Sequence, residues 1–574
     1  YYTYEIRHDD ITEETIDIYA RTAGVNGAMG MVIDLEETNP AGWHNYHPEP
    51  LEHYTDAVIY EMHVRDFSID KSGNFCYKGR FLAFVEKGVI NAAGDKIGID
   101  HLKELGVTHV HLMPSFDYQT VDETRLNVPQ FNWGYDPQNF NCPEGSYSTN
   151  PYDGRARVAE FKRLVHALHC QGIRVIMDVV YNHTYATADS PFNKIFNKYY
   201  YRLWGENGEY FSNGSGCGNE IATERFMVRK YIIDSLVYWA TEYKIDGFRF
   251  DLMGLYDIET MNKIDETLHA INPDIILYRE GWIGGDSPLA DSKRAMKLNA
   301  RHTPNIAFFS DDFRDTIKGN NFENRSRGYV NGATGSEEYV KEVMCGRIPH
   351  PQIPNLTKFA WTLSPCQTVN YVEAHDNLTL WDKLIYTNPT DSLETRKKMD
   401  KMAAACVFLA QGIPFIQAGQ DFLRSKPLPG GAYDHNSYNS PDAVNSLKWD
   451  RKSEFRDVFD YYKGLIEFRK AHSALRMFTA EDIGRNMKFF DHLPQRIVGF
   501  GLYGDCELEE IIVFFNPTND DITLHAFGEY NVYIDGDNAG NKPLYTVCDD
   551  YIIKPHSTMV MGRPYPQPEE EAAE

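Results

Sequence analysis

Short apolar runs recur along most of the chain, and each is followed by a longer segment that usually carries a helical pattern. The runs are 57–65, 107–114, 174–180, 247–253, 275–282, 305–312, 368–377 and 413–421. Amphipathic helices are predicted between them, for example at 155–172 and 224–243, and at 401–412 directly before the last run. Strands that alternate with helices in this way predict an α/β fold, a parallel (β/α)8 TIM barrel. A doubly wound open sheet built from the same units is the alternative.

The pattern differs at the two ends of the chain, which predicts further units there. Residues 1–55 hold strand-like runs such as 27–38, too few for a complete domain, and are predicted to be the end of a truncated N-terminal β-module. The barrel is predicted over 56–484, with long loops at 115–154 and 181–223 after its second and third strands and a closing helix at 454–472. Short alternating strands over 485–563 predict a C-terminal antiparallel β-sandwich, and 564–574 reads as an acidic, disordered tail.

Composition and charge narrow the class of protein. The chain has 574 residues, 42% of them hydrophobic, and a net charge of -26, which opposes binding to nucleic acid or to an anionic membrane and favours an uncharged partner. The longest apolar run, 402–410, is too short to span a bilayer. Nine widely spaced cysteines without a C-x-x-C pair predict mostly buried thiols instead of a disulfide or zinc framework.

The chain begins at Tyr1 without a methionine, so a leader or further domains before it stay open. The sequence therefore does not decide the compartment, although an extracellular or cell-surface location is favoured over a cytoplasmic one. A monomer is expected.

Three carboxylates follow three of the predicted strands. In the stretch DGFRFDLMG, Arg249 and Asp251 share one strand face, and the phenylalanines between and before them share the other. Asp251, Glu280 and Asp376 are predicted to end the fourth, fifth and seventh strands, so all three would face one mouth of the barrel. A carboxyl pair that flanks one bond is what glycoside cleavage requires. Solvated strand ends are the alternative for each acid taken alone.

The neighbours of these acids suggest how each keeps its protonation state. Arg249 can pair with Asp251, which would lower the pKa of that carboxyl and keep it an anion. Glu280 lies between Tyr278 and Trp282 on its strand face, where partial desolvation and nearby like charge would raise its pKa toward that of a general acid. His183 and His375 could donate to sugar hydroxyls, or could be structural histidines.

Four segments resemble the conserved regions of the α-amylase superfamily, glycoside hydrolase family 13: DVVYNH (178–183), GFRFDLMG (247–254), REGW (279–282) and VEAHDN (372–377). FNWGYDP (131–137) is similar to a signature of type I pullulanases. This resemblance implies a retaining debranching hydrolase that cleaves α-1,6-glucosidic bonds of pullulan, amylopectin and limit dextrins. It implies that Asp251 is the nucleophile, Glu280 the general acid/base and Asp376 the residue that stabilises the transition state.

The resemblance also implies a substrate-binding set. The matched residues are Tyr135, Asp178, His183, Arg249, Trp282, His375 and Asn377, with Tyr135 and Trp282 stacking on glucose rings. Two positions depart from the family pattern. Arg279 replaces the usual glycine before the glutamate, so we expect added bulk and charge beside the acid, and Phe131 replaces a tyrosine.

The expected mechanism is attack by Asp251 on the anomeric carbon while Glu280 protonates the leaving oxygen, with the two carboxyl groups about 5 to 5.5 Å apart. Alternatives are an isoamylase-like or α-1,4-cleaving specificity, a non-catalytic starch-binding protein, and a metallohydrolase built from His109, His111, Asp178 and His183. No cofactor is expected to be required. A structural calcium ion could bind in the Asp/Asn-rich loops, although the sequence identifies no complete ligand set.

Overall fold

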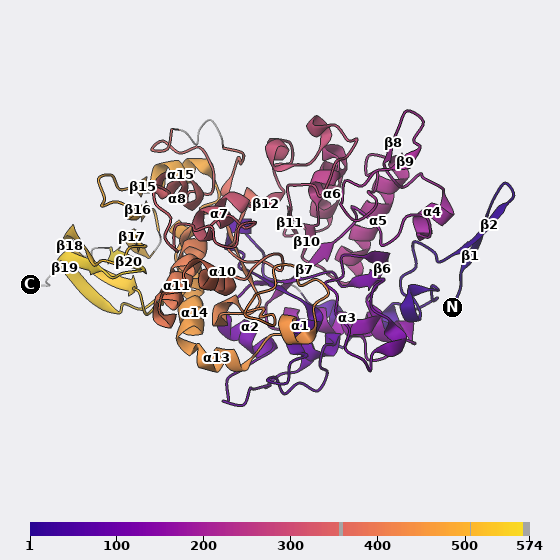
Figure 1. Ribbon diagram of the computed structural model, residues 1–574, viewed down its shortest axis with the longest axis horizontal. Helices are drawn as coiled ribbons and strands as arrows, with labels where there is room; N and C mark the ends of the chain where they lie inside the picture. Colours follow the sequence, from indigo (N-terminus) through magenta and orange to yellow (C-terminus); the bar gives the residue numbers. More distant parts are fainter. Residues whose placement is uncertain (47, 355–359, 506, 566–574) are drawn as a thin grey trace, which may run out of the picture.

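The computed structural model describes residues 1–46, 48–354, 360–505 and 507–565. At its centre, parallel strands form a closed barrel (Figure 1). In chain order they are β3 (Ile59–Met62), β4 (His109–Leu112), β7 (Arg174–Val179), β10 (Gly247–Phe250), β11 (Ile276–Arg279), β12 (Ala307–Phe309), β13 (Thr368–Asn370) and β14 (Ile413–Gln417). Each strand lies within one of the predicted runs. Pairing of β14 with β3 closes the ring, so the barrel prediction is confirmed and the open sheet is excluded.

Strand alternation divides the apolar residues of the barrel between two cores. Inward side chains, such as Ile176, Tyr278 and Phe415, fill the interior of the ring. Outward side chains, such as Val110 and Phe248, pack beneath the surrounding helices as part of the main core. The barrel is therefore filled with side chains, and only its mouth is available for a ligand.

Helices follow most of the strands and cover the ring. The longer ones are α2 (Ile99–Leu105), α3 (Gly154–His169), α5 (Phe226–Glu242), α6 (Ile258–Ile271), α7 (Asp311–Lys318), α8 (Glu337–Met344), α10 (Leu380–Thr387), α11 (Leu393–Leu409), α14 (Arg456–Ala471) and α15 (Ala480–Asn486). Short helices are α1 (Val64–Ser68), α4 (Pro191–Ile195), α12 (Asp442–Asn445) and α13 (Asp450–Glu454). The helices predicted from the sequence correspond to α3, α5, α11 and α14. Among the described residues, no helix combines the length and the apolar content needed to cross a membrane.

The two long loops predicted after β4 and β7 each carry a small hairpin. The first contains β5 (Phe116–Tyr118) and β6 (Pro137–Pro143), and the second contains β8 (Leu203–Trp204) and β9 (Tyr210–Phe211). Both loops leave the carboxyl ends of barrel strands, so they build up the mouth of the barrel.

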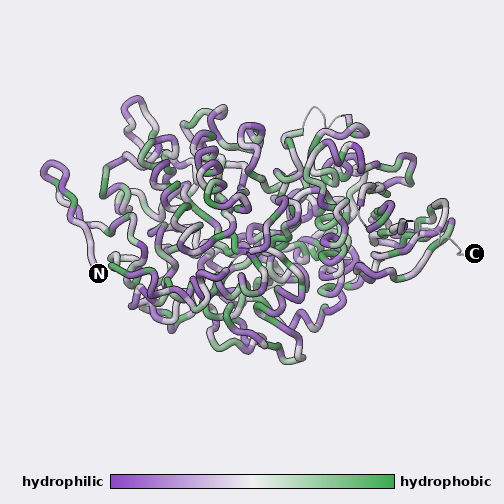
Figure 2. The backbone as a smooth tube through the Cα atoms, turned by 180° about the vertical axis from the view of Figure 1, so that it is seen from behind, coloured by the Kyte–Doolittle hydropathy of each residue, from purple (hydrophilic) through white to green (hydrophobic). Residues whose placement is uncertain are grey.

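The N-terminal segment begins with a two-stranded hairpin, β1 (Tyr4–His8) and β2 (Ile11–Thr15). It projects from one end of the long axis and is largely hydrophilic (Figures 1 and 2). The strand prediction at 27–38 is wrong: Gly30 makes only isolated bridges, and Glu36–Thr38 form a 3-10 helix. The Asp34 side chain accepts a hydrogen bond from the Glu36 main chain, a local contact that competes with strand pairing. That residues 1–55 end a β-module stays a prediction.

The C-terminal strands form one antiparallel sheet at the opposite end of the molecule (Figure 1). They are β15 (Met487–Phe489), β16 (Val498–Tyr503), β17 (Leu508–Asn516), β18 (Ile522–Ile534), β19 (Tyr545–Ile553) and β20 (Ser557–Pro564), in the order β15-β16-β17-β20-β18-β19. The predicted antiparallel β-domain is confirmed, but its strands form a single curled sheet with its own apolar cluster on one face, where a sandwich of two sheets was predicted. The other face, which includes Phe500 and Val513, joins the core beneath the barrel helices. Residues 566–574 of the predicted tail lie outside the described residues.

The cysteines described by the structure are free, as expected, but the prediction that most are buried is wrong. Cys142, Cys345 and Cys406 are buried, Cys366 is intermediate, and Cys76, Cys170, Cys217 and Cys548 are exposed. The exposed ones lie in loops, at a helix end and on an edge strand, where apolar packing does not cover them.

Candidate active site

Three acidic side chains converge on the guanidinium of Arg249 inside the barrel. Arg249 points inward from β10 and is buried. Its Nη1 lies 3.0 Å from Asp178 Oδ1 and 3.0 Å from Asp251 Oδ1, and its Nη2 lies 2.5 Å from Glu280 Oε1. The register explains the convergence, because Arg249 pairs with Asp178 of β7 and the residue after it pairs with the last residue of β11. The next rung of the sheet therefore sets Asp251 beside Glu280.

The main chain holds both of these acids at the strand ends. Asp251 donates its N–H to Val179 at 3.0 Å, and Glu280 donates its N–H to Phe250 at 3.2 Å, so each continues the ladder of its strand. The chain then turns at Leu252, which has a positive φ of 39°, and the Gly254 N–H reaches the Trp282 carbonyl at 3.1 Å. A Cβ at Gly254 would lie 2.5 Å from that oxygen, so only glycine allows the two loops this approach.

The third acid, Asp376, lies farther from its strand than predicted. β13 ends at Asn370, so Asp376 belongs to the loop that follows, and its side chain is half exposed. The strand stops early because this segment bonds elsewhere: Glu373 accepts the Leu380 N–H at 2.6 Å, and Glu61 accepts the His375 N–H at 2.7 Å. The loop still brings Asp376 to the cavity that Glu280 lines.

A cavity of about 610 Å³ opens at this mouth of the barrel. From the predicted set, its lining includes Arg249, Glu280, Trp282, His375, Asp376 and Asn377. The other predicted residues lie behind or beside the cavity. Asp178 and Asp251 contact Arg249. The Tyr135 hydroxyl lies 2.7 Å from Asp178, and His183 Nε2 lies 2.8 Å from the Tyr135 carbonyl. The structure therefore brings the whole predicted set together at one place.

Burial controls the electrostatics of the two inner acids. For Glu280, burial raises the pKa to about 8; the negative charges of Asp251 and Asp376 act in the same direction, and Arg249 opposes them. For Asp251 the predicted direction is wrong. Burial raises the pKa of its carboxyl above the ordinary value although Arg249 opposes this shift, because removal from water outweighs one shared guanidinium.

The sequence of this chain is similar to those of known glycoside hydrolases. The family model described as the α-amylase catalytic domain matches residues 75–204. A pullulanase of Bacillus subtilis is 40% identical over 519 residues, which cover 89% of this chain and 69% of that protein. The chain belongs to the pullulanases of the α-amylase family.

Solved pullulanase structures share its fold. That of Bacillus acidopullulyticus superimposes with a TM-score of 0.92 at 42% identity, over 98% of this chain and 67% of that one. A variant pullulanase of Paenibacillus barengoltzii complexed with maltotetraose gives a TM-score of 0.91 at 42% identity, over 98% of this chain and 85% of that one. The chain spans less of other relatives, such as 41% of pullulanase A of Streptococcus pneumoniae.

Some residues of this pullulanase site were not singled out from the sequence. Glu61 of β3 accepts two hydrogen bonds from His375, and Asn182 donates to Asp251 Oδ2 at 3.0 Å. His111 of β4 lies with Nε2 3.2 Å from Asp178 Oδ2. Strand alternation could have found Glu61, because it shares the inward face of β3 with Ile59, whereas His111 was considered only as a metal ligand.

The position of Arg279 corrects another expectation. Arg279 precedes Glu280 in a strand, so its side chain points to the opposite face, outside the barrel. Its guanidinium stacks 3.7 Å above the Phe308 ring and donates to Thr303 and to Met253 Sδ. It is fully buried and does not line the cavity, so it adds neither bulk nor charge on the substrate side of the acid.

The residues proposed for a metallohydrolase do not form a metal site. His109 contacts Thr108 through Nδ1, and His183 contacts Tyr135, so the four predicted ligands are not gathered around one point. Within the described part of the chain, the only cluster with three closely spaced ligand atoms is formed by Asp117, Glu123 and Glu144.

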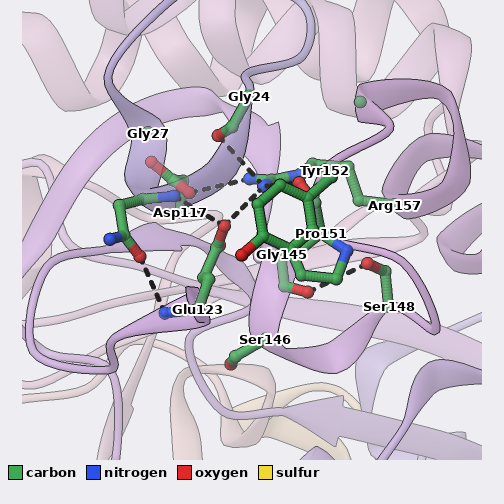
Figure 3. Close-up of polar contacts among 12 residues, drawn as sticks. Gly24, Gly27, Asp117, Glu123, Gly145, Ser146, Ser148, Pro151, Tyr152 and Arg157 are labelled. Atoms are coloured by element: carbon green, nitrogen blue, oxygen red, sulfur yellow. Dashed lines mark hydrogen bonds and ion pairs between the residues drawn. The ribbon is translucent and has the colours of Figure 1, made fainter. Parts of the chain in front are cut away.

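That acidic cluster already holds a cation of the protein itself. Arg157 of α3 lies 2.9 Å from Asp117 Oδ1 and 2.9 Å from Glu123 Oε2, and also donates to the Gly24 carbonyl (Figure 3). The Glu144 carboxylate accepts main-chain N–H groups of Tyr118 and Ser146. These contacts suit a guanidinium, and a structural calcium ion stays a prediction.

Proposed function

We propose that this chain is a retaining debranching enzyme that hydrolyses α-1,6-glucosidic bonds in pullulan, amylopectin and limit dextrins. The observation that carries the proposal is the pair Asp251 and Glu280, which bind neighbouring nitrogens of one buried guanidinium at the edge of a cavity. Relatives were crystallised with maltotetraose and with maltose, which supports an α-glucan as the ligand.

In the proposed reaction, Asp251 attacks the anomeric carbon and displaces the O6 of the neighbouring glucose, while Glu280 gives its proton to that oxygen. Water then attacks the glycosyl-enzyme and loses a proton to Glu280, which restores both carboxyl groups and retains the anomeric configuration. Burial suits Glu280 to the first step because its raised pKa keeps it protonated near neutral pH. Arg249 stays bound to Asp251 and Glu280 throughout.

The neighbouring residues have proposed roles in holding the sugar. Asp376 and His375 line the cavity beside Glu280 and can bind hydroxyl groups of the reacting ring. Tyr135 stacks on His375, with ring centroids 5.1 Å apart, and its hydroxyl donates to Asp178 at 2.7 Å, which places its ring beside the same residues. Trp282 offers an aromatic face to the next glucose.

The test is the hydrolysis of pullulan by the wild type, Asp251→Asn and Glu280→Gln. We expect each variant to lose at least about a thousandfold in kcat while it stays folded, because each removes a group that takes part in bond making or breaking. Asp246→Asn is the matched control: Asp246 directly precedes the same strand at the other end of the barrel, where it contacts His169 and the Val175 N–H. Near-normal turnover by either catalytic variant would contradict the assignment.

The products separate the related specificities. Pullulan cut only at α-1,6 bonds yields maltotriose, whereas panose or maltose would show α-1,4 cleavage. A chain that binds pullulan without releasing sugars would instead be the starch-binding protein considered above. Proton NMR of the first product should show the α-anomer, as retention requires.

A further inference from the structure

Glu61 is a buried carboxylate under the cavity, and no step of the proposed reaction uses it. It points inward from β3, is 1% exposed, and is one of the residues that line the cavity. Its Oε2 accepts the main-chain N–H of His375 at 2.7 Å, and its Oε1 lies 2.8 Å from His375 Nδ1. Both oxygens of one carboxylate therefore bind the same residue, which fixes the histidine main chain and its ring together.

Those two contacts also determine which ring nitrogens carry a proton. A carboxylate accepts hydrogen bonds and cannot donate them, so Nδ1 facing Glu61 must hold a proton. His375 Nε2 faces the other way, 3.7 Å from Asp376 Oδ2, in the cavity lining. Two acidic groups on opposite sides of the ring favour the imidazolium, with an N–H at each nitrogen.

Charged groups of both signs surround His375. The acids are Glu61, Asp376 and Asp178, and the bases are Arg249 and Lys426. Lys426 donates from Nζ to the His375 carbonyl at 2.8 Å. Burial alone would lower the pKa of His375, and Arg249 acts in the same direction. The acids outweigh both and raise the pKa to about 9. The Glu61 carboxylate itself remains ionised, because His375, His111 and Arg249 bring its pKa below the ordinary value in spite of burial.

We propose that Glu61 is a positioning residue for the debranching reaction: it fixes His375 through two hydrogen bonds and keeps its imidazole cationic, so that Nε2–H faces the sugar. This inference rests on the proposed function, because it assigns His375 to the subsite where the bond breaks. The cation offsets part of the negative charge of Asp251 and Asp376, and it supplies a charged donor for a sugar hydroxyl.

The informative substitution is Glu61→Gln, which keeps the shape of the side chain. Its single amide oxygen can accept the main-chain N–H, so its NH2 group would face Nδ1 and require a lone pair there. His375 would then be neutral at pH 7. We expect kcat on pullulan to fall at least about tenfold at pH 7, and this loss to shrink as the pH is lowered and the ring regains its proton.

Two further variants separate positioning from stability. Glu61→Asp keeps the carboxylate, so part of the activity and the wild-type pH profile should return. Asp421→Asn is the matched control, because Asp421 and His101 form another fully buried pair, 3.2 Å apart, that does not line the cavity. A loss of kcat in Glu61→Gln that is the same at every pH, and equal to the loss in Asp421→Asn, would overturn the proposal.

A spectroscopic titration tests the same inference without reference to turnover. In protein with 13C-labelled histidine, the ring signal that disappears in His375→Gln should titrate near pH 9 in the wild type and below pH 7 in Glu61→Gln. A wild-type titration near 6.5 would overturn the proposal, even if Glu61→Gln failed to fold. Activity retained by Asp251→Asn would refute the proposed function alone, because this titration would still decide whether Glu61 keeps the His375 ring cationic.

Discussion

At the scale of single residues, the protonation of Glu280, the proposed general acid, should limit the pH range of the reaction. The general acid must hold its proton to release the leaving group, and burial raises the pKa of Glu280 to about 8. We therefore expect kcat/KM on pullulan to fall as the pH rises through about 8, approaching tenfold for each further pH unit. A pH–rate profile from pH 5 to pH 10 measures this, and a rate that stays level to pH 10 would contradict the role of Glu280.

Arg279 gives a second prediction at this scale. It is a fully buried cation, and among the residues that the structure describes it has no carboxylate partner and no hydrogen-bond acceptor for its Nε. Removing such a charge relieves a desolvation cost, so Arg279→Met should leave the free energy of unfolding unchanged or raise it by about 1 kcal/mol or more. Activity should not change, because the side chain points away from the cavity.

The control for this substitution is Arg469→Met. Arg469 is equally buried, but it donates to the carbonyls of Phe408, Ala410, Thr55 and Gly412, so its loss should destabilise the protein. Urea unfolding gives both stabilities. A changed KM for pullulan in Arg279→Met would show instead that this arginine acts on the substrate side after all.

Strand alternation predicts the inner residues of the site well and the outer ones poorly. Arg249, Asp251 and Glu280 sit on or directly after regular strands, so their faces follow from the period of two. Asp376 follows a loop whose path depends on Glu61, a residue more than three hundred positions earlier, and no local pattern contains that contact. The direction of the Asp251 pKa shift was not predictable for a similar reason, because Arg249 is close in sequence whereas the burial that outweighs it arises only in the folded chain.

At the scale of elements, one arginine ties the N-terminal segment to the barrel. Arg157 on α3 binds Asp117 of β5 and Glu123 of the next loop, and it reaches Gly24 of the N-terminal segment. Arg157→Met would leave these buried carboxylates without their cation and should cost about 3 to 5 kcal/mol in the free energy of unfolding, measured in urea.

The neighbouring Arg155 is the control for that prediction. It lies two residues earlier on α3, and its mostly exposed side chain pairs with Asp153. Arg155→Met should therefore change the free energy of unfolding by no more than about 1 kcal/mol. Equal effects of the two substitutions would show that the buried cluster does not depend on Arg157.

Elements that repeat along the chain were predictable, and isolated ones were not. The barrel strands and the helices α3, α5, α11 and α14 follow from apolar periodicity, because each buries one face against its neighbours. The run 27–38 has a similar pattern of apolar residues, but among the described residues it makes only isolated bridges and no strand ladder. It therefore forms turns and a 3-10 helix. The same reasoning predicted two facing sheets at the C-terminus where the structure has one, because a sheet that buries its second face against helices shows the same alternation.

At the scale of the whole molecule, the candidate active site joins parts of the chain that are far apart in sequence. Glu61 comes from the first barrel strand and His375 from beyond the seventh, and they meet across the ring that β14 closes onto β3. Neither half of the chain can assemble this arrangement alone. A chain that has not yet paired β14 with β3 cannot bring Glu61 and His375 together, so we expect cleavage of pullulan to begin only after the ring has closed.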